Sequence, residues 1–276
     1  MEKPLIHPAS DTTLSLMLSD LPQSLLLTGP EGVGLTTIAK YIAGALDVLR
    51  IIVLPEKDEK IDLEKGTITV DIIRRLYDQT RTIETKKRII IIDYAERMAI
   101  PAQNAFLKLL EEPGEGTHFI LATHAPSKLL PTITSRTVPL ELRPLTKTQT
   151  ELFLDSLKVK DAARRTQLIY IADGLPAELY RLTADETYFA AAVQLVRDAR
   201  ELLQASTYAK LRLAHTYRDN RENTLKLLTT ALNILKRSIS DKPQASLIAQ
   251  IDAILLAHQH IKANGNIRLC LARLVV

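Results

Sequence analysis

The sequence contains a single cysteine, Cys270, and no uninterrupted apolar run of about 18 residues. One cysteine cannot form an internal disulfide or a cysteine-cluster zinc site, and it suits a reducing compartment. The absent apolar run excludes a predicted membrane span. The first residues, MEKPLIHPASD, also lack a basic segment followed by an apolar core. We therefore expect a cytoplasmic protein with no secretion signal, no zinc and no membrane partner.

The remaining composition is that of an ordinary globular protein. The 276 residues allow two or three domains, and 46% of them are hydrophobic and 25% charged. The net charge of +4 is unevenly distributed, because residues 187–276 hold 13 Lys and Arg against 6 Asp and Glu, whereas residues 1–186 hold 23 against 26. A basic carboxyl-terminal third favours either nucleic-acid binding or a plain solvated helical surface.

The most informative stretch is residues 88–113, RIIIIDYAERMAIPAQNAFLKLLEEP. Residues 89–92 are four isoleucines followed by Asp93, a pattern that predicts a buried parallel strand. In open α/β sheets, ligands bind beyond the carboxyl ends of the strands, so Asp93 marks the expected site. A helix is predicted over residues 102–112, and Pro113 ends it.

A glycine loop, GPEGVGLTT at residues 29–37, follows a predicted strand at 24–28 and enters a predicted helix. Strand, glycine loop and helix are the context of a phosphate-binding P-loop, but Leu35 stands where that loop has lysine. Losing this charge-assisted bond removes about 1.5–3 kcal/mol, which is roughly ten- to a hundredfold in affinity. Backbone N–H groups can still cradle an anion, and the Thr36 hydroxyl can still ligate Mg²⁺. Two hypotheses stay open: a structural relic, or a loop that binds ATP and Mg²⁺ weakly.

The catalytic base of an ATPase is also missing from its usual place. Tyr94 follows Asp93, where a hydrolysing site has glutamate beside the Mg²⁺-binding aspartate. A tyrosine, with a pKa near 10, is a poor base at neutral pH.

Three phrases of the sequence resemble bacterial clamp-loader subunits, the AAA+ proteins that open sliding clamps for the replicative polymerase. Residues 102–113, AQNAFLKLLEEP, resemble the family signature NALLKxLEEP. Residues 67–75, TITVDIIRR, resemble I-x-V-D-x-I-R, and residues 129–140, LLPTITSRTVPL, resemble the box LPxTIxSRC. The resemblance covers nearly the whole chain and is strongest over residues 20–145.

The family resemblance implies a fold class and three domains. The fold class is α/β plus all-α: an AAA+ parallel-sheet P-loop domain, a small helical lid and a carboxyl-terminal helical collar. The expected boundaries are 1–143 for the degenerate ATPase-like domain, 144–185 for the lid, and 186–276 for the collar, through which subunits form a ring.

The resemblance also assigns site residues. It implies a degenerate nucleotide site made of Gly29, Gly32, Gly34, Leu35, Thr36, Thr37, Asp93 and Thr123, with Thr123 in the sensor-1 place. The place of the sensor-2 arginine falls near Ala177. Arg136, in a Ser-Arg-Thr step, matches the arginine that the family presents to ATP bound by the neighbouring subunit; an ordinary surface arginine is the alternative. We expect no cofactor beyond weakly bound ATP and Mg²⁺, and no metal site.

Within the family, the loss of ATP-handling residues with Arg136 kept is similar to the delta-prime type of subunit, which does not hydrolyse ATP. The implied partners are gamma/tau-like and delta-like subunits in a hetero-oligomeric ring, with the sliding clamp and primer–template DNA reached through the complex. One alternative is an active gamma/tau-type ATPase subunit, which Leu35 disfavours. Another is a stand-alone P-loop enzyme such as a small-molecule kinase, which needs the missing lysine.

Overall fold

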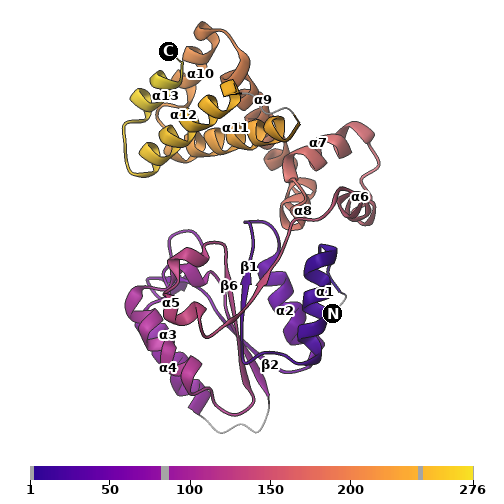
Figure 1. Ribbon diagram of the computed structural model, residues 1–276, viewed down its shortest axis with the longest axis vertical. Coiled ribbons are helices and arrows are strands. Elements are labelled where there is room, and N and C mark those ends of the chain that lie inside the picture. Colours follow the sequence, from indigo (N-terminus) through magenta and orange to yellow (C-terminus); the bar gives the residue numbers. More distant parts are fainter. Residues whose placement is uncertain (1–2, 82–86, 242–244, 276) are drawn as a thin grey trace. The chain divides into compact units, whose positions relative to one another are not determined.

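The computed structural model describes residues 3–81, 87–241 and 245–275. The chain divides into two compact units, Met1–Arg181 and Leu182–Val276, which are described separately (Figure 1). The expected division into three domains stays a prediction. A linker was expected at residues 183–185, but helix α8 (Pro176–Ala184) runs through Ala184, and the Asp185 side chain caps helix α9 (Glu186–Gln204). None of the described helices is long and apolar enough to cross a bilayer.

A parallel sheet organises the first unit. Its strands, in the order β2-β5-β6-β1-β7, are β2 (Leu49–Val53), β5 (Arg88–Ile92), β6 (Thr117–Thr123), β1 (Ser24–Thr28) and β7 (Val138–Glu141). The strands predicted at 24–28 and 89–92 are confirmed, and so is the strand that the sequence HFILAT predicts at 118–123. Strand β2 was not predicted, and the segment at 55–66, expected to be a plain loop, contains a short hairpin, β3 (Glu56–Lys57) and β4 (Lys60–Ile61).

Helices cover both faces of this sheet, and Figure 1 shows α1 and α2 on one side with α3 and α4 on the other. The helices are α1 (Pro8–Ser19), α2 (Leu35–Ala45), α3 (Val70–Arg81), α4 (Ile100–Glu111) and α5 (Pro131–Thr134), with single 3-10 turns η1 (Ala95–Arg97) and η2 (Pro126–Lys128). Helix α4 begins two residues before its predicted start, and α5 is shorter than the predicted helix at 129–135. A strand covered on both faces is apolar throughout, which explains the unbroken isoleucine run of β5.

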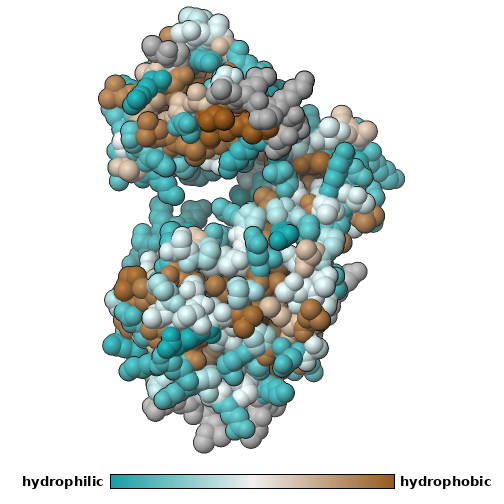
Figure 2. All heavy atoms as spheres, viewed as in Figure 1, coloured by the Kyte–Doolittle hydropathy of each residue, from teal (hydrophilic) through white to brown (hydrophobic). Residues whose placement is uncertain are grey.

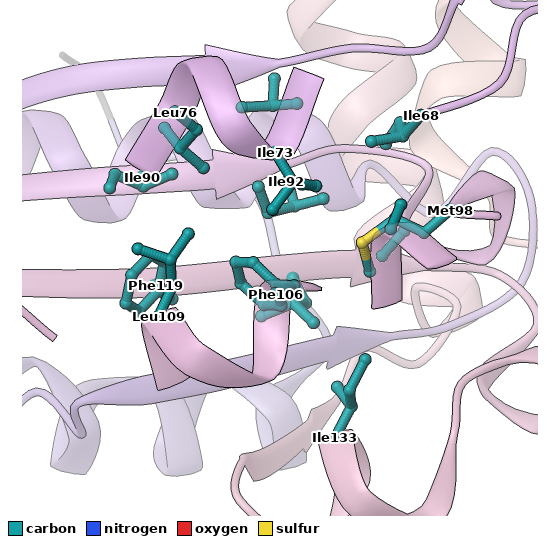
Figure 3. Close-up of a cluster of buried hydrophobic side chains, with 14 of the residues drawn as sticks. Ile68, Ile73, Leu76, Ile90, Ile92, Met98, Phe106, Leu109, Phe119 and Ile133 are labelled. Carbon is teal, nitrogen blue, oxygen red and sulfur yellow. The ribbon is translucent and has the colours of Figure 1, made fainter. Parts of the chain in front are cut away.

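The isoleucines of β5 alternate between two cores. Ile90 and Ile92 pack with Phe106 of α4, as Figure 3 shows, while Ile89 and Ile91 pack in the cluster on the α1 and α2 side. The Phe106 ring meets Phe119 of β6 edge-on, with ring centroids 5.3 Å apart. These contacts fix α4 against the sheet.

A buried arginine closes the amino end of β5. The Arg88 side chain is 5% exposed, and its Nη2 donates to the Thr80 carbonyl at 3.1 Å. Thr80 lies in the last turn of α3, where carbonyls lack intrahelical partners and form the negative end of the helix dipole. Arg88 therefore stabilises the end of α3, and it needs no external anion.

Three further helices complete the first unit: α6 (Lys147–Ser156), α7 (Ala162–Ala172) and the beginning of α8. Thr146, predicted to cap a helix, does so in a capping box with Gln149, which satisfies the backbone donors at the start of α6.

The second unit is helical, with α9 followed by α10 (Thr207–Tyr217), α11 (Arg221–Asp241), α12 (Ala245–Lys262) and α13 (Ile267–Val275). On α11 the sequence predicts one apolar face made of Leu225, Leu228, Leu232, Leu235 and Ile239, and it is confirmed by the burial of Leu228, Leu232 and Leu235. On α12 the sequence predicts a face made of Leu247, Ile251, Leu255, His258 and Ile261. This face is partly wrong, because Leu255 is 38% exposed whereas Ile254 is buried. Hydrophobic residues also gather on the face of this unit seen in Figure 2.

Candidate functional site

The glycine loop between β1 and α2 has a backbone conformation that depends on its glycines. Gly32 and Gly34 have φ angles of +85° and +96°, in the left-handed region that favours glycine. A Cβ atom on Gly29 would lie 2.6 Å from the Leu142 carbonyl oxygen. All three glycines are therefore required by the fold itself, with or without a ligand.

Leu35 is a core residue. It begins α2, it is 3% exposed, and it packs in the same apolar cluster as Val33 and Ile38. The side chain at the place of the phosphate-binding lysine thus faces the protein interior. The resulting loop offers no charged side chain from this position to a phosphate.

The two residues expected to handle Mg²⁺ bind each other. The Thr36 hydroxyl donates to Asp93 Oδ2 at 2.8 Å, and the Tyr94 N–H donates to the other carboxylate oxygen at 3.1 Å. Asp93 is 5% exposed, and burial raises the pKa of its carboxyl above the ordinary value, against the effect of these two hydrogen bonds. Both oxygens of Asp93 therefore already have partners within the chain.

Tyr94 occupies the place of the catalytic glutamate in a left-handed conformation, with φ 53°. Burial, and then the nearby charge of Asp93, raise the pKa of its phenol above 10, so it stays protonated at neutral pH. Its ring meets the His124 ring edge-on at 6.3 Å, and the Arg97 guanidinium lies 5.5 Å from its centroid. Tyr94 thus serves packing at this site and cannot act as a base.

Sequence reasoning missed His124 as a site residue. Its Nδ1 donates to the Gly29 carbonyl at 2.8 Å, which ties the end of β6 to the glycine loop. The sequence did offer one indication of His124: it directly follows Thr123, at the carboxyl end of strand β6, where ligands bind in open α/β sheets. Thr123 itself is fully buried, and its hydroxyl accepts from the Ala125 N–H at 3.1 Å.

The beginning of α8 lies directly on the loop. The Ala177 N–H donates to the Gly32 carbonyl at 3.0 Å, and a Cβ on Gly32 would lie 3.5 Å from the Cβ atoms of Leu175 and Glu178. Ala177 is where the resemblance expects the sensor-2 arginine, so a backbone contact stands in place of that side chain. Thr37, by contrast, is exposed on α2.

Of the predicted nucleotide-site residues, the loop glycines, Thr36 and Asp93 come together, while Leu35 turns into the core and Thr37 into solvent. Within the ranges that the structure describes, no three His, Cys, Asp or Glu side chains are grouped as metal ligands would be.

Arg136 lies elsewhere on the sheet. It follows α5 and precedes β7, an edge strand that runs parallel to β1. The loop begins after the carboxyl end of β1, so Arg136 and the chain's own loop lie toward opposite ends of the strands. The Arg136 side chain is 41% exposed; its Nη2 lies 2.9 Å from Glu111 Oε1, and its Nη1 donates to the Thr132 carbonyl at 3.1 Å.

Comparisons with known proteins point to one family. Residues 46–146 match the family described as DNA polymerase III, delta subunit. The delta' subunit of DNA polymerase III from Pseudomonas aeruginosa is 31% identical over 188 residues, covering 57% of this chain and 54% of that protein. The gamma/tau subunit from Mycobacterium bovis is 30% identical over 150 residues, covering 48% of this chain and 26% of that protein. The chain thus spans about half or less of the length of these relatives.

Solved structures agree on the fold. A gamma subunit-related protein of DNA polymerase III from Thermotoga maritima covers 96% of both chains with a TM-score of 0.55 and 19% identity. A RuvB variant from the same organism covers 86% of this chain and 82% of its own, with a TM-score of 0.53 and 19% identity. At these identities the likeness carries the fold alone, an α/β sheet domain followed by helical parts.

Proposed function

We propose that this chain, a relative of the AAA+ clamp-loader subunits of bacterial DNA polymerase III, acts as a delta-prime-type subunit that does not hydrolyse ATP itself. In this role it helps to load the sliding clamp onto primed DNA and supplies Arg136 to ATP bound by a neighbouring subunit. The observation that carries the proposal is the contrast between Leu35, buried in the core, and Arg136, exposed just before the edge strand β7.

The loop supports the non-hydrolysing role. Thr36 and Asp93 bind each other, and Tyr94 has a pKa too high for a base. An incoming Mg–ATP complex would find no lysine at position 35 to bind its phosphates, because the buried Leu35 side chain stands there. We expect the isolated chain to show no ATPase above background and an affinity for Mg–ATP that is millimolar or absent. ATPase activity in the isolated chain would favour a gamma/tau-type subunit instead.

Arg136 supports the trans-acting role. A guanidinium offers five N–H donors in a rigid fork and keeps its charge at neutral pH, which suits a γ-phosphate. Because the chain's own loop lies toward the other ends of the strands, the phosphate that Arg136 can reach belongs to another subunit. Arginines supplied in this way accelerate phosphoryl transfer by about 10³ to 10⁵.

The helical unit supports a ring. Several of its large hydrophobic side chains are exposed, including Tyr208 at 79%, Leu269 at 71% and Ile248 at 53%. Hydrophobic residues that gather on one face, as in Figure 2, are typical of surfaces that other proteins cover. The proposed partners are gamma/tau-like and delta-like subunits, and we assign the contacts with them to this unit.

The test is steady-state ATPase activity of the loader reconstituted from the subunits that co-purify with this chain, with clamp and primed DNA. Arg136→Ala should leave the complex assembled and lower turnover at the neighbouring site by about 10³ or more. Arg136→Lys should rescue little, because lysine keeps the charge and loses the fork.

The matched control is Arg74→Ala. Arg74 is also an exposed arginine in an ion pair, 3.3 Å from Asp71, but it lies on α3. Its variant should keep the wild-type rate. If Arg136→Ala also keeps that rate, Arg136 is an ordinary surface residue and the proposed trans-acting role is wrong.

A further inference from the structure

We infer that Glu111 is the positioning residue for Arg136, and that its carboxylate holds the guanidinium in the orientation in which it meets a neighbour's phosphate. This inference rests on the proposed function of Arg136. It adds a residue from a different element, at the far end of α4, to the trans-acting site.

Two acceptors hold the guanidinium from two elements. Glu111, the last residue of α4, places Oε1 2.9 Å from Nη2, and the Thr132 carbonyl of α5 accepts from Nη1 at 3.1 Å. Bonds at two nitrogens to acceptors on separate elements fix both the direction and the plane of the fork. The other N–H groups belong to a side chain that is 41% exposed, so they remain available to an external anion.

The backbone that carries Arg136 is anchored to the same helix. Gln103, in the first turn of α4, donates through Nε2 to the Lys128 carbonyl at 3.1 Å and accepts through Oε1 from the Leu130 N–H at 2.8 Å. Ile133 of α5 is fully buried in the same cluster as Phe106, and Figure 3 shows both. Helix α4 therefore holds the backbone of this segment through Gln103 and reaches the Arg136 side chain through Glu111.

Helix stability does not explain the presence of Glu111. The carboxyl end of a helix carries partial negative charge, so an acidic side chain there is locally unfavourable and a basic one is preferred. Glu111 ends α4, and a second acid, Glu112, caps it. The positive charge of Arg136 offsets the negative charge of Glu111 through their ion pair. The exposed Glu112 has no comparable ion pair among those that the described residues form.

The exposure of the pair sets the size of the effect. The Glu111 side chain is 51% exposed, and an exposed ion pair typically shifts an equilibrium by no more than about fivefold. Glu111 should therefore raise the fraction of time that Arg136 spends in the correct orientation, without binding ATP itself. This role predicts a change in kcat at the neighbouring site and an unchanged KM for Mg–ATP.

The experiment compares Glu111→Ala, Glu111→Gln and the control Glu112→Ala in the reconstituted loader, with Mg–ATP as substrate. Glu111→Ala should lower kcat by about two- to fivefold with the same KM. Glu111→Gln keeps an acceptor oxygen for Nη2 and should lie between wild type and alanine. Glu112→Ala should match wild type, and thermal unfolding of each full chain shows whether the fold is intact.

A double-mutant cycle separates positioning from a general structural effect. In an Arg136→Ala background, Glu111→Ala should change kcat no further, because the group that it positions is gone. An equal loss in both backgrounds, no loss at all, or a faster loader would each overturn the positioning role. If Arg136→Ala itself has no effect, the proposed function fails; if only Glu111→Ala has none, this inference alone fails.

Discussion

The glycine loop and the segment that carries Arg136, residues 128–136 (the Arg136 segment), differ in where their polar groups find hydrogen-bond partners. At the loop, donors and acceptors meet inside the chain: Thr36 with Asp93, His124 with the Gly29 carbonyl, and Ala177 with the Gly32 carbonyl. At the other segment, Arg136 is half exposed and is held by one surface carboxylate and one carbonyl. The polar groups of the loop thus have partners within the chain, whereas the Arg136 side chain stays partly open to another molecule, as the proposed function requires.

The largest expected effect concerns the support of the Arg136 segment. Gln103 is 1% exposed, and its amide bonds the Met98 and Lys128 carbonyls and the Leu130 N–H. Gln103→Ala leaves buried groups unsatisfied, at about 1–3 kcal/mol each, and should lower the free energy of unfolding by about 3–5 kcal/mol. Urea denaturation of the full chain measures this.

The control for that variant is Asn104→Ala, on the next, exposed position of α4. It should change the free energy of unfolding by about 0.5 kcal/mol or less. If the two variants unfold alike, the segment that carries Arg136 does not depend on Gln103 for its attachment to α4.

The second prediction concerns the loop. Leu35 is 3% exposed, so Leu35→Ala should leave a cavity and lower the free energy of unfolding by about 2–4 kcal/mol. Thr37→Ala, on an exposed position of the same helix turn, should be near neutral. If urea denaturation shows only a small loss in the free energy of unfolding for Leu35→Ala, this position is not part of the core.

Local sequence patterns predicted the elements around both regions. Strand β5 is an unbroken apolar run, helix α4 is followed by Pro113, and the loop is rich in glycine. The contacts on which the two proposals rest join residues distant in the sequence, such as Glu111 with Arg136 and Ala177 with Gly32, and no local pattern specifies such pairs.

Two structural misses have different causes. Strand β2 was overlooked because its five residues adjoin a charged segment and include Arg50. On α12, residues 253–257 are apolar at every position, so the sequence does not specify which side faces the core, and Ile254 is buried in place of Leu255. Periodicity identifies a helix in such a run but leaves its rotation open.

The smallest expected effect is a gain in stability at Asp93. Asparagine can keep both hydrogen bonds, since Oδ1 accepts from the Tyr94 N–H and Nδ2 donates to the Thr36 hydroxyl oxygen, which reverses the direction of the present bond. The substitution removes only the charge. Because burial disfavours the charged carboxylate, Asp93→Asn should raise the free energy of unfolding at pH 7, by less than either of the losses predicted above.

The pH dependence gives this prediction its sign. The pKa of Asp93 is raised in the folded chain, so the folded state binds this proton more tightly than the unfolded state does. Ionised Asp93 therefore lowers stability above the folded pKa, and the loss disappears as the pH falls toward the unfolded value of about 3.9. The advantage of Asp93→Asn over wild type should be full at pH 7 and shrink toward pH 4. A variant less stable than wild type at pH 7 would mean that the negative charge of Asp93 itself stabilises the loop.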